Sequence, residues 1–526
     1  MFGDNDTIAA PATAPGGALS IIRLSGARAV ECADAVFRGR RALADAAPAT
    51  LHYGRIVDGE RTVDDVVVSL FRAPHSYTGE DSVEISCHGS QYIVSEILRL
   101  LTAAGARLAT PGEFTARAFL AGRIDLSQAE AVADMIAADS RAAHAMASTQ
   151  MRGAYSESLH DLRDRLLRLT SLLELELDFS EEDVAFADRA ELRRTMQEIA
   201  VEIDRLTGSF TLGNAIKEGV AVAIVGAPNA GKSTLLNRLL GEERAMVSDI
   251  AGTTRDTVEE RMNIDGVTFR FIDTAGLRDT DDRLEALGIE RTRDAISRAN
   301  IVISLTTPGN SPEPVALHDD QRLITVINKI DLIGRDISAA QQHTADAHTT
   351  ESAPDDESCP NSTYAARNRT AMASDIENNT ADPAAERSAG DSTRHSGTAS
   401  GIPALCGGDI GERTQATNSF GRTPEVRISA LNGEGIDNLI SALSASVDTR
   451  ALYAGDAIVS SARHREALAA AGESLAQALE ALAADLPADL LSEDIRSVIH
   501  HLGTITGEIT SDDILRNIFS KFCIGK

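Results

Sequence analysis

One segment near the middle of the chain has the residue types of a phosphate-binding loop. It reads Gly226-x-x-x-x-Gly231-Lys232-Ser233 and follows an apolar stretch at 220–225. Glycines let backbone N–H groups curl around phosphates, and the start of a following helix adds a favourable dipole. A lysine at this position meets the β- and γ-phosphates, and the serine binds Mg²⁺. The spacing therefore predicts a strand, a nucleotide-binding loop and a helix.

Two segments downstream could complete the phosphate end of such a site. The stretch "AGTTRD" at 251–256 places Thr254 as a second Mg²⁺ ligand in a mobile switch. An apolar strand then ends in Asp273-Thr274-Ala275-Gly276. A carboxylate at a strand end can hold Mg²⁺ through water, and the N–H of Gly276 can meet the γ-phosphate.

Two further segments have the residue types that recognise guanine. A strand at 323–327 ends in Asn328-Lys329-Ile330-Asp331, and Asp331 can accept hydrogen bonds from guanine N1–H and its 2-amino group. Adenine lacks both donors and would leave a buried carboxylate unpaired, at a cost of about 1–3 kcal/mol. Ser429-Ala430-Leu431 follows, and the Ala430 N–H suits guanine O6. The segments together predict a GTPase and resemble the translation-factor-like branch of P-loop GTPases. The predicted GTP-binding residues in them are Asn229, Ala230, Gly231, Lys232, Ser233, Thr234, Thr254, Asp273, Thr274, Ala275, Gly276, Asn328, Lys329, Asp331, Ser429, Ala430 and Leu431.

The position that holds a water-orienting glutamine in Ras-like enzymes is Leu277 here. Leucine cannot polarise water, so hydrolysis needs another group. Asn229 could ligate a monovalent cation against the phosphates, or it could simply cap the loop. Glu285 could position water through an intermediary, although composition alone favours a solvated helix face.

Bulk composition limits the function classes. The chain has 526 residues, 43% of them hydrophobic, and a formal net charge of −29. Such acidity argues against broad, non-specific nucleic-acid binding. Five scattered cysteines predict neither a disulfide framework nor a zinc cluster, and Cys87-His88 is at most half of a metal site. The acidic, proline-broken start is no signal peptide, and no run is long enough to span a membrane, so we expect a cytoplasmic protein.

Periodicity predicts a multidomain protein with α/β and all-α parts. Residues 1–118 form an α+β domain, with strands expected at 18–24, 64–71 and 81–89 and a helix at 91–105. A discontinuous helical domain covers 119–213 and 451–526, with amphipathic helices at 162–179 and 465–486. A P-loop GTPase domain is inserted at 214–450. Within it, residues 336–420 are polar and predicted to be disordered.

The chain ends on "FCIGK", with one thiol at Cys523. As a lipidation box the tail is poor, since Lys526 is not a usual terminal residue. The alternative of a membrane-attached GTPase therefore depends only on the cysteine near the C-terminus. Thr510-x-x-Asp513 predicts a capping box that starts the last helix, at 511–520, and aims the thiol at a defined place.

These motifs together resemble the MnmE (TrmE) family of tRNA-modification GTPases. The resemblance rests on "GAPNAGKS", "AGTTRD", "DTAGLRD", the N-terminal "PHSYTGEDSVEISCHGS" and the terminal "FCIGK". It covers nearly the whole chain except 336–420. It implies a homodimer through the N-terminal domain, a folate site in that domain, and G domains that dimerise across the nucleotide in K⁺.

The resemblance also assigns residues. Asn229 with the backbone carbonyls of Ser248, Ile250 and Thr253 would hold K⁺. Glu285 would be the catalytic glutamate, which reverses its interpretation as part of a solvated helix face. Cys523 becomes a candidate acid, base or nucleophile. The GTP-binding set extends to Ser248, Asp249, Ile250, Ala251, Gly252 and Thr253. The folate-contacting positions are Arg23, Glu84, Arg123, where a lysine is expected, and Lys526.

The implied reaction adds a carboxymethylaminomethyl or aminomethyl group to C5 of the wobble uridine of certain tRNAs. The carbon comes from 5,10-methylene-tetrahydrofolate (or 5-formyl-tetrahydrofolate), and a partner, MnmG, forms a hetero-oligomer and supplies FAD. The alternative is a regulatory or ribosome-assembly GTPase without modification chemistry. Such a protein would carry a basic RNA-binding module, which this acidic chain lacks, and would not need the N-terminal motif or the thiol tail.

Overall fold

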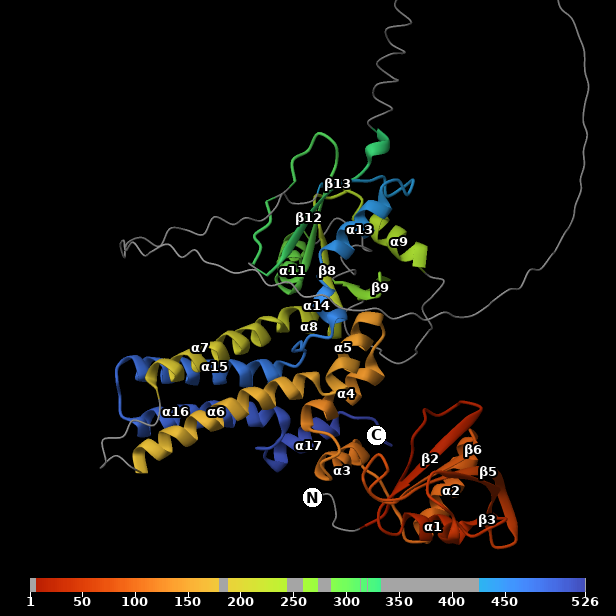
Figure 1. Ribbon diagram of the computed structural model, residues 1–526. Helices are drawn as coiled ribbons and strands as arrows, with labels where there is room; N and C mark the ends of the chain where they lie inside the picture. The colour runs from red at the N-terminus through yellow and green to blue at the C-terminus, as the bar shows by residue number, and fades with distance from the viewer. Residues whose placement is uncertain are drawn as a thin grey trace, which may run out of the picture. The chain divides into compact units, whose positions relative to one another are not determined.

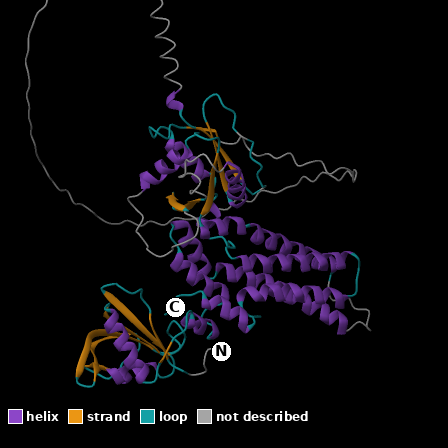
Figure 2. Ribbon diagram, turned by 180° about the vertical axis from the view of Figure 1, so that it is seen from behind, coloured by secondary structure: helices purple, strands orange, loops and turns teal. Residues whose placement is uncertain are grey.

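The computed structural model describes residues 6–178, 188–243, 259–272, 285–312, 314–318, 320–332 and 425–525. For 177–178, 242–243 and 285–291 it describes the backbone only. The elements form two β-sheets and a set of helices (Figures 1 and 2). The predicted disordered insertion at 336–420 lies outside the described residues.

A seven-stranded sheet occupies the N-terminal part, in the order β3-β4-β5-β6-β2-β1-β7. Three of its strands were predicted at 18–24, 64–71 and 81–89, and they are confirmed; the other four were missed because they are short or amphiphilic. The strands are β1 (Ile8–Pro11), β2 (Leu19–Ser25), β3 (Phe37–Gly39), β4 (Thr50–Asp58), β5 (Arg61–Phe71), β6 (Ser82–His88) and β7 (Arg107–Leu108).

One face of this sheet is covered by helices α1 (Ala29–Val36) and α2 (Gln91–Ala103), the second of which was predicted. Apolar residues alternate toward that face, as in β2, where Ile22 and Leu24 are fully buried. Cys32 of α1 belongs to the same core. The alternate residues point to the other face of the sheet, and two of them, Leu51 and Tyr53, are 71% and 70% exposed.

Four long helices form a bundle: α6 (Ala154–Asp178), α7 (Arg189–Gly208), α15 (Ala462–Ala483) and α16 (Ala488–Thr506) (Figure 1). Buried leucines recur along α6 at three- and four-residue spacing, which gives a continuous apolar stripe. The helices predicted at 162–179 and 465–486 correspond to α6 and α15. The chain pairs helices from before and after the second sheet, so this core joins residues more than 250 positions apart, such as Arg205 and the Ala457 carbonyl.

The second sheet has six strands in the order β13-β12-β11-β8-β10-β9, of which only β9 is antiparallel to its neighbour. Parallel strands bring their carboxyl ends to one edge, where ligands bind in open α/β sheets. The strands are β8 (Val220–Val225), β9 (Glu260–Ile264), β10 (Val267–Phe271), β11 (Ile301–Thr306), β12 (Arg322–Ile327) and β13 (Glu425–Arg427). Its helices are α9 (Lys232–Glu243), α11 (Glu285–Arg298) and α13 (Ile436–Ala445).

Shorter helices lie around the bundle and the second sheet. They are α3 (Glu113–Leu120), α4 (Leu126–Ala137), α5 (Arg141–Met151), α8 (Phe210–Glu218), α14 (Arg450–Ala454) and α17 (Asp512–Ser520). Residues of α5 and α8, including Met146 and Ile216, share one apolar core with Phe269 of β10. The second sheet therefore packs directly on the helical part of the chain.

The start of the last helix differs from the prediction. The N-cap of α17 is Ser511 rather than Thr510, and no side chain hydrogen-bonds the exposed N–H groups there. The predicted capping box from Thr510 to Asp513 is therefore wrong. Instead, Asp512 and Asp513 lie in the first turn, where a carboxylate is stabilised by the positive end of the helix dipole.

Two absences concern only the described ranges. No helix in them is long and apolar enough to cross a membrane. No group of three or more His, Cys, Asp or Glu side chains in them could hold a metal ion. The His88 side chain is instead paired with Asp64, whose Oδ1 lies 2.7 Å from His88 Nδ1.

Candidate functional site

The loop between β8 and α9 has the backbone form that a phosphate cradle needs. Asn229 and Gly231 both have positive φ, at 64° and 100°. A Cβ on Gly231 would lie 2.3 Å from Asn328 Nδ2, so only glycine fits this close approach. Lys232 Nζ donates to the Gly226 and Ala227 carbonyls, at 2.8 and 3.1 Å. The lysine thus lies across the loop, within reach of phosphates held by it.

Asn328 connects three segments at the carboxyl end of the parallel strands. It is 2% exposed; its Nδ2 donates to the Ala230 carbonyl at 2.8 Å and its Oδ1 accepts from the Ala430 N–H at 2.9 Å. One amide therefore fixes the phosphate loop against the segment after β13. The Ala430 N–H, which the sequence assigns to guanine O6, is engaged by Asn328, so a guanine oxygen must share that donor.

Asp331 lies in the 3-10 turn Ile330–Leu332 that follows β12. Its Oδ1 accepts a hydrogen bond from Ser429 Oγ at 2.7 Å. The serine holds one side of the carboxylate, and the half-buried group retains acceptor capacity for two further donors. The arrangement suits recognition of the guanine edge.

Eleven of the predicted nucleotide and cation residues are not described, whereas Ser233, Thr234, Lys329 and Leu431 lie in the described segments beside those above. Ser248, Asp249, Ile250, Ala251, Gly252, Thr253, Thr254, Asp273, Thr274, Ala275 and Gly276 lie outside the described ranges. Glu285 is the first residue of α11, and its side chain is not described. Their roles stay predictions.

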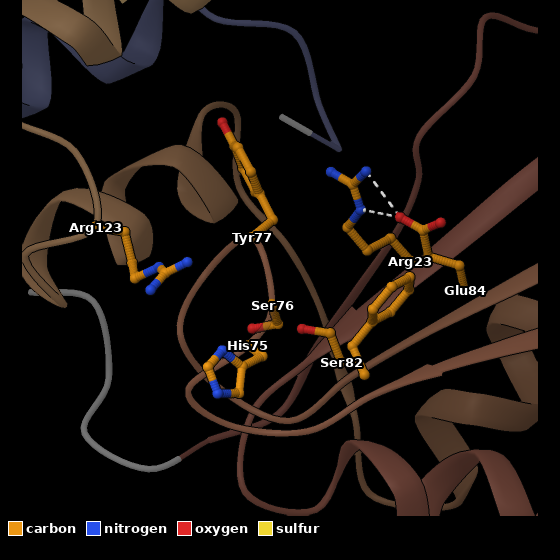
Figure 3. Close-up of a pocket in the computed structure, with 8 residues that line it drawn as sticks. Arg23, His75, Ser76, Tyr77, Ser82, Glu84 and Arg123 are labelled. Carbon is orange, nitrogen blue, oxygen red and sulfur yellow. Dashed lines mark hydrogen bonds and ion pairs between the residues drawn. The ribbon is translucent and has the colours of Figure 1, made fainter. Parts of the chain in front are cut away.

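A second site lies on the open face of the N-terminal sheet. It is a pocket of about 410 Å³ between the sheet and the loop that joins β5 to β6 (Figure 3). Arg23 of β2 and Glu84 of β6 are directly opposite each other in the ladder. Arg23 Nη2 lies 2.8 Å from Glu84 Oε1, and Nε lies 2.9 Å from the same oxygen. The pocket is lined by Arg23, Phe71, His75, Ser76, Tyr77, Ser82, Glu84 and Arg123.

The structure thus brings together three of the four predicted folate contacts. Arg123 lines the pocket across from the Arg23–Glu84 pair (Figure 3). The fourth, Lys526, lies outside the described residues. The pocket offers a paired carboxylate and two guanidinium groups, a donor and acceptor set that fits a ligand with a hydrogen-bonding heterocycle at one end and carboxylates at the other.

The loop residues His75, Ser76 and Tyr77 had no role in the sequence analysis, although the "PHSYTGED" motif contains them. The Tyr77 ring lies 5.4 Å from the Arg23 guanidinium carbon, and its hydroxyl is 2.9 Å from Thr115 Oγ1 of α3. Burial raises the pKa of Tyr77 above its usual value. Tyr77 therefore remains a neutral phenol at physiological pH.

Glu80, from the same loop, is bound to the sheet and to α3. It accepts from Ser25 Oγ at 2.6 Å and from Arg117 Nη1 at 3.2 Å. Arg117 is 6% exposed and also contacts Glu113, which is fully buried. Burial alone would raise the pKa of Glu113, but Arg107, the Thr110 N–H and Arg117 lower it to about 2. The ionised network keeps the pocket loop in one position.

The C-terminal tail reaches this pocket from the far end of the sequence. The Gly525 carbonyl accepts a hydrogen bond from Arg23 Nη1 at 3.3 Å, and the Cys523 carbonyl accepts one from the Gly112 N–H at 3.4 Å. Phe519 and Phe522 anchor the tail in a small core with α3 and α4. The Cys523 side chain is exposed.

Comparison with known proteins identifies the family of the chain. Residues 7–123 match the family described as GTP-binding protein TrmE N-terminus, and residues 126–523 match the MnmE helical domain. The chain belongs to the MnmE family. It is 43% identical over 534 residues to the tRNA modification GTPase MnmE of Bacteroides fragilis, covering 99% of this chain and 100% of that protein. The MnmE protein of Christiangramia forsetii is 44% identical over 525 residues, covering 99% of each chain.

Among solved structures, the G domain of the FeoB iron transporter of T. maritima aligns at 16% identity with a TM-score of 0.20. The alignment covers 43% of this chain and 98% of that one, and the likeness is too weak to inform the fold.

Proposed function

We propose that this MnmE-family chain is a GTP-hydrolysing enzyme of tRNA modification. It adds a carboxymethylaminomethyl or aminomethyl group to C5 of the wobble uridine, in the cytoplasm. The observation that carries the proposal is the hydrogen bond from Arg23 to the Gly525 carbonyl. It brings the thiol-bearing tail to a pocket that a GTPase acting only as a switch would not need.

The nucleotide site binds GTP through its own residues. The loop N–H groups and Lys232 hold the phosphates, and Asp331 selects guanine. Ser233, at the start of α9, would hold Mg²⁺ together with Thr254. Bound Mg²⁺ supplies charge neutralisation at the phosphates.

With Leu277 in place of a glutamine, hydrolysis needs a cation and a distant carboxylate. Asn229 is exposed on the loop, at positive φ, so its amide oxygen can face a ligand. It would hold K⁺ with the carbonyls of Ser248, Ile250 and Thr253, and Glu285 would orient water. A faster hydrolysis in K⁺ than in Na⁺ at equal ionic strength supports this assignment, and equal rates contradict it.

The N-terminal pocket would hold the folate one-carbon donor through Arg23, Glu84, Arg123 and Lys526. When bound, 5,10-methylene- or 5-formyl-tetrahydrofolate supplies the carbon unit. The chain's residues fix the ligand: the Arg23–Glu84 pair meets its heterocycle and Arg123 its carboxylates. Arg123 keeps the positive charge expected at that position, and its planar group can bind a carboxylate through two hydrogen bonds. Cys523 is the candidate acid, base or nucleophile.

The assembly we propose is a homodimer formed through the N-terminal domain, bound to MnmG, which supplies FAD. Apolar side chains exposed on the open face of the N-terminal sheet support a dimer. Leu19, Leu51 and Tyr53 are between 66% and 71% exposed there. Leu51 and Tyr53 lie two positions apart on the same face of β4, and exposed apolar patches of this kind are typical of protein interfaces.

Reconstitution tests the proposal. The purified chain, MnmG, GTP, a folate donor and a tRNA transcript with uridine at the wobble position should yield a modified nucleoside by mass analysis. Omission of this chain, or of GTP, should abolish the product. Product formation without this chain would contradict the proposed function.

A further inference from the structure

An acidic enzyme that modifies tRNA needs a local surface for the phosphate backbone. Every phosphate repels a chain with a formal net charge of −29. Affinity for nucleic acid therefore depends on places where arginine or lysine is not matched by acidic groups.

Such a place lies at the outer edge of the N-terminal sheet. β3, labelled in Figure 1, is the terminal strand of that sheet, and β4 is its only neighbour in the strand order. The segment 35–44 contains three arginines and no acidic residue. Arg38, Arg40 and Arg41 are all exposed, and Arg55 of β4 is exposed directly opposite Arg38 in the ladder. We call these four residues the arginine edge.

The arginines of this edge differ in their contacts. Arg38 Nη1 donates to the carbonyls of Asp34, Ala35 and Phe37, and so closes the end of α1. Among the ion pairs of the described residues, none involves Arg40, Arg41 or Arg55. In contrast, the exposed arginines Arg61 and Arg99 are both bound to Asp58 and Glu96.

The acidic groups nearest to the edge are engaged or lie to one side. Asp34 Oδ1 accepts from the Leu43 N–H at 2.6 Å. Asp65 lies opposite Arg55 on the next strand, so it offsets that arginine in part. Arg40 and Arg41, which follow β3, take part in no ion pair among the described residues, and the exposed Asp45 follows them four positions later in the chain.

The backbone that presents these arginines is closely packed. Gly39 and Gly54 face each other across the ladder, and a Cβ on Gly54 would lie 2.5 Å from the Phe37 ring and from the Arg38 carbonyl. The Phe37 side chain is 3% exposed and packs over both glycines. This packing fixes β3 against β4, which carry Arg38 and Arg55, and Arg40 and Arg41 follow in the bend directly after β3.

We propose that the arginine edge binds the phosphate backbone of tRNA, with Arg40 and Arg41 as the principal contacts. This inference rests on the proposed function, because it takes tRNA as the substrate. The planar guanidinium of arginine binds a phosphate through two parallel hydrogen bonds. Such a contact depends on phosphate charge and not on base sequence, so it positions the tRNA while other elements select the uridine. Charged residues on an edge strand also prevent edge-to-edge aggregation, which is the competing explanation.

The test is tRNA binding by the full-length chain, measured by fluorescence anisotropy from 50 to 200 mM salt. The double variant Arg40→Gln/Arg41→Gln is compared with Arg193→Gln/Arg194→Gln on α7. The second pair is also adjacent and exposed, so both variants lose the same charge. Loss of two phosphate contacts should lower the slope of log affinity against log salt by roughly 1.8. The fall in affinity over this salt range should then be about tenfold smaller than for the unaltered chain.

The α7 variant should bind as the unaltered chain does, and both variants should keep its thermal midpoint and its GTP hydrolysis rate. Three results with the variants would overturn the inference. These are an unchanged slope in the Arg40/Arg41 variant, an equal loss in both variants, and unchanged binding accompanied by aggregation of the Arg40/Arg41 variant. Absence of tRNA binding by the unaltered chain also overturns it, whereas the proposed function is decided separately by wobble-uridine analysis.

Discussion

Replacement of Gly525 by alanine should detach the tail from the pocket. Gly525 is buried at φ +90°, and a Cβ there would lie 2.1 Å from the Pro11 carbonyl oxygen and 3.0 Å from Ala12 Cα. These atoms belong to backbone, so they cannot rotate away. A non-glycine residue in this backbone region costs about 1–2 kcal/mol, and overpacking a close contact typically adds about 1–3 kcal/mol.

The sum sets a lower bound of about 2 kcal/mol against the docked tail, which is roughly a 30-fold fall in the ratio of docked to undocked tail. Hydrogen exchange can report this ratio, because the Gly112 N–H donates to the Cys523 carbonyl only when the tail is docked. The Gly112 amide should exchange roughly 30-fold faster in the variant. The thermal midpoint and the GTP hydrolysis rate should change little, because Gly525 belongs neither to the core of the helical bundle nor to that of the second sheet.

A matched control is Gly455→Ala. Gly455 has a similar φ of +85°, but a Cβ there would meet nothing within 4 Å. It therefore carries the backbone strain without the clash, and it should leave both Gly112 exchange and tRNA modification unchanged. Wild-type exchange at Gly112 together with wild-type modification in Gly525→Ala would refute the reasoning.

Four other substitutions test separate parts of the account. Asp331→Asn should shift nucleotide preference from GTP toward xanthosine triphosphate, and unchanged GTP affinity would count against the guanine assignment. Arg23→Gln should weaken folate binding roughly 10- to 100-fold, since about 1.5–3 kcal/mol attaches to a hydrogen bond with a charged group, while titration with GTP stays as in the wild type. Cys523→Ser should abolish tRNA modification and leave GTP hydrolysis unchanged. Modification that survives the substitution would show that the thiol takes no part in the reaction. Glu130→Gln concerns stability: burial raises the pKa of Glu130, but His464 and Arg463 lower it to about 2 from 4.5. Because the folded pKa is the lower one, ionised Glu130 stabilises the fold above about pH 4.5 by about 3 kcal/mol, and this contribution is lost as pH falls toward 2. The difference in unfolding free energy between wild type and Glu130→Gln should shrink over that range, and a constant difference would contradict the ion pair.

Most of the nucleotide site could be predicted from the sequence, because its chemistry depends on residues that are close along the chain. The glycines, Lys232 and Ser233 lie within one loop, and the strand before it and the helix after it have clear periodicity. The bridging role of Asn328 was not readable. It depends on the parallel order of β8, β12 and β13, which brings together segments about 100 residues apart.

The N-terminal pocket was harder to predict from the sequence. Tyr77 and Glu80 acquire their roles through Thr115, Ser25 and Arg117, which are distant in sequence and ordinary in type. The start of the last helix was predicted one residue too early, because Thr510 and Asp513 fit a capping pattern, whereas the N-cap is Ser511 and the helix begins at Asp512. Local patterns identify caps and loops, but they do not weigh one register against the next.

The most direct test of the central claim is mass analysis of the wobble uridine in tRNA from cells that lack this protein. The account predicts that the carboxymethylaminomethyl and aminomethyl forms disappear, and that they return with the wild-type chain but not with Arg23→Gln. Normal modification in the cells that lack the protein would contradict the account.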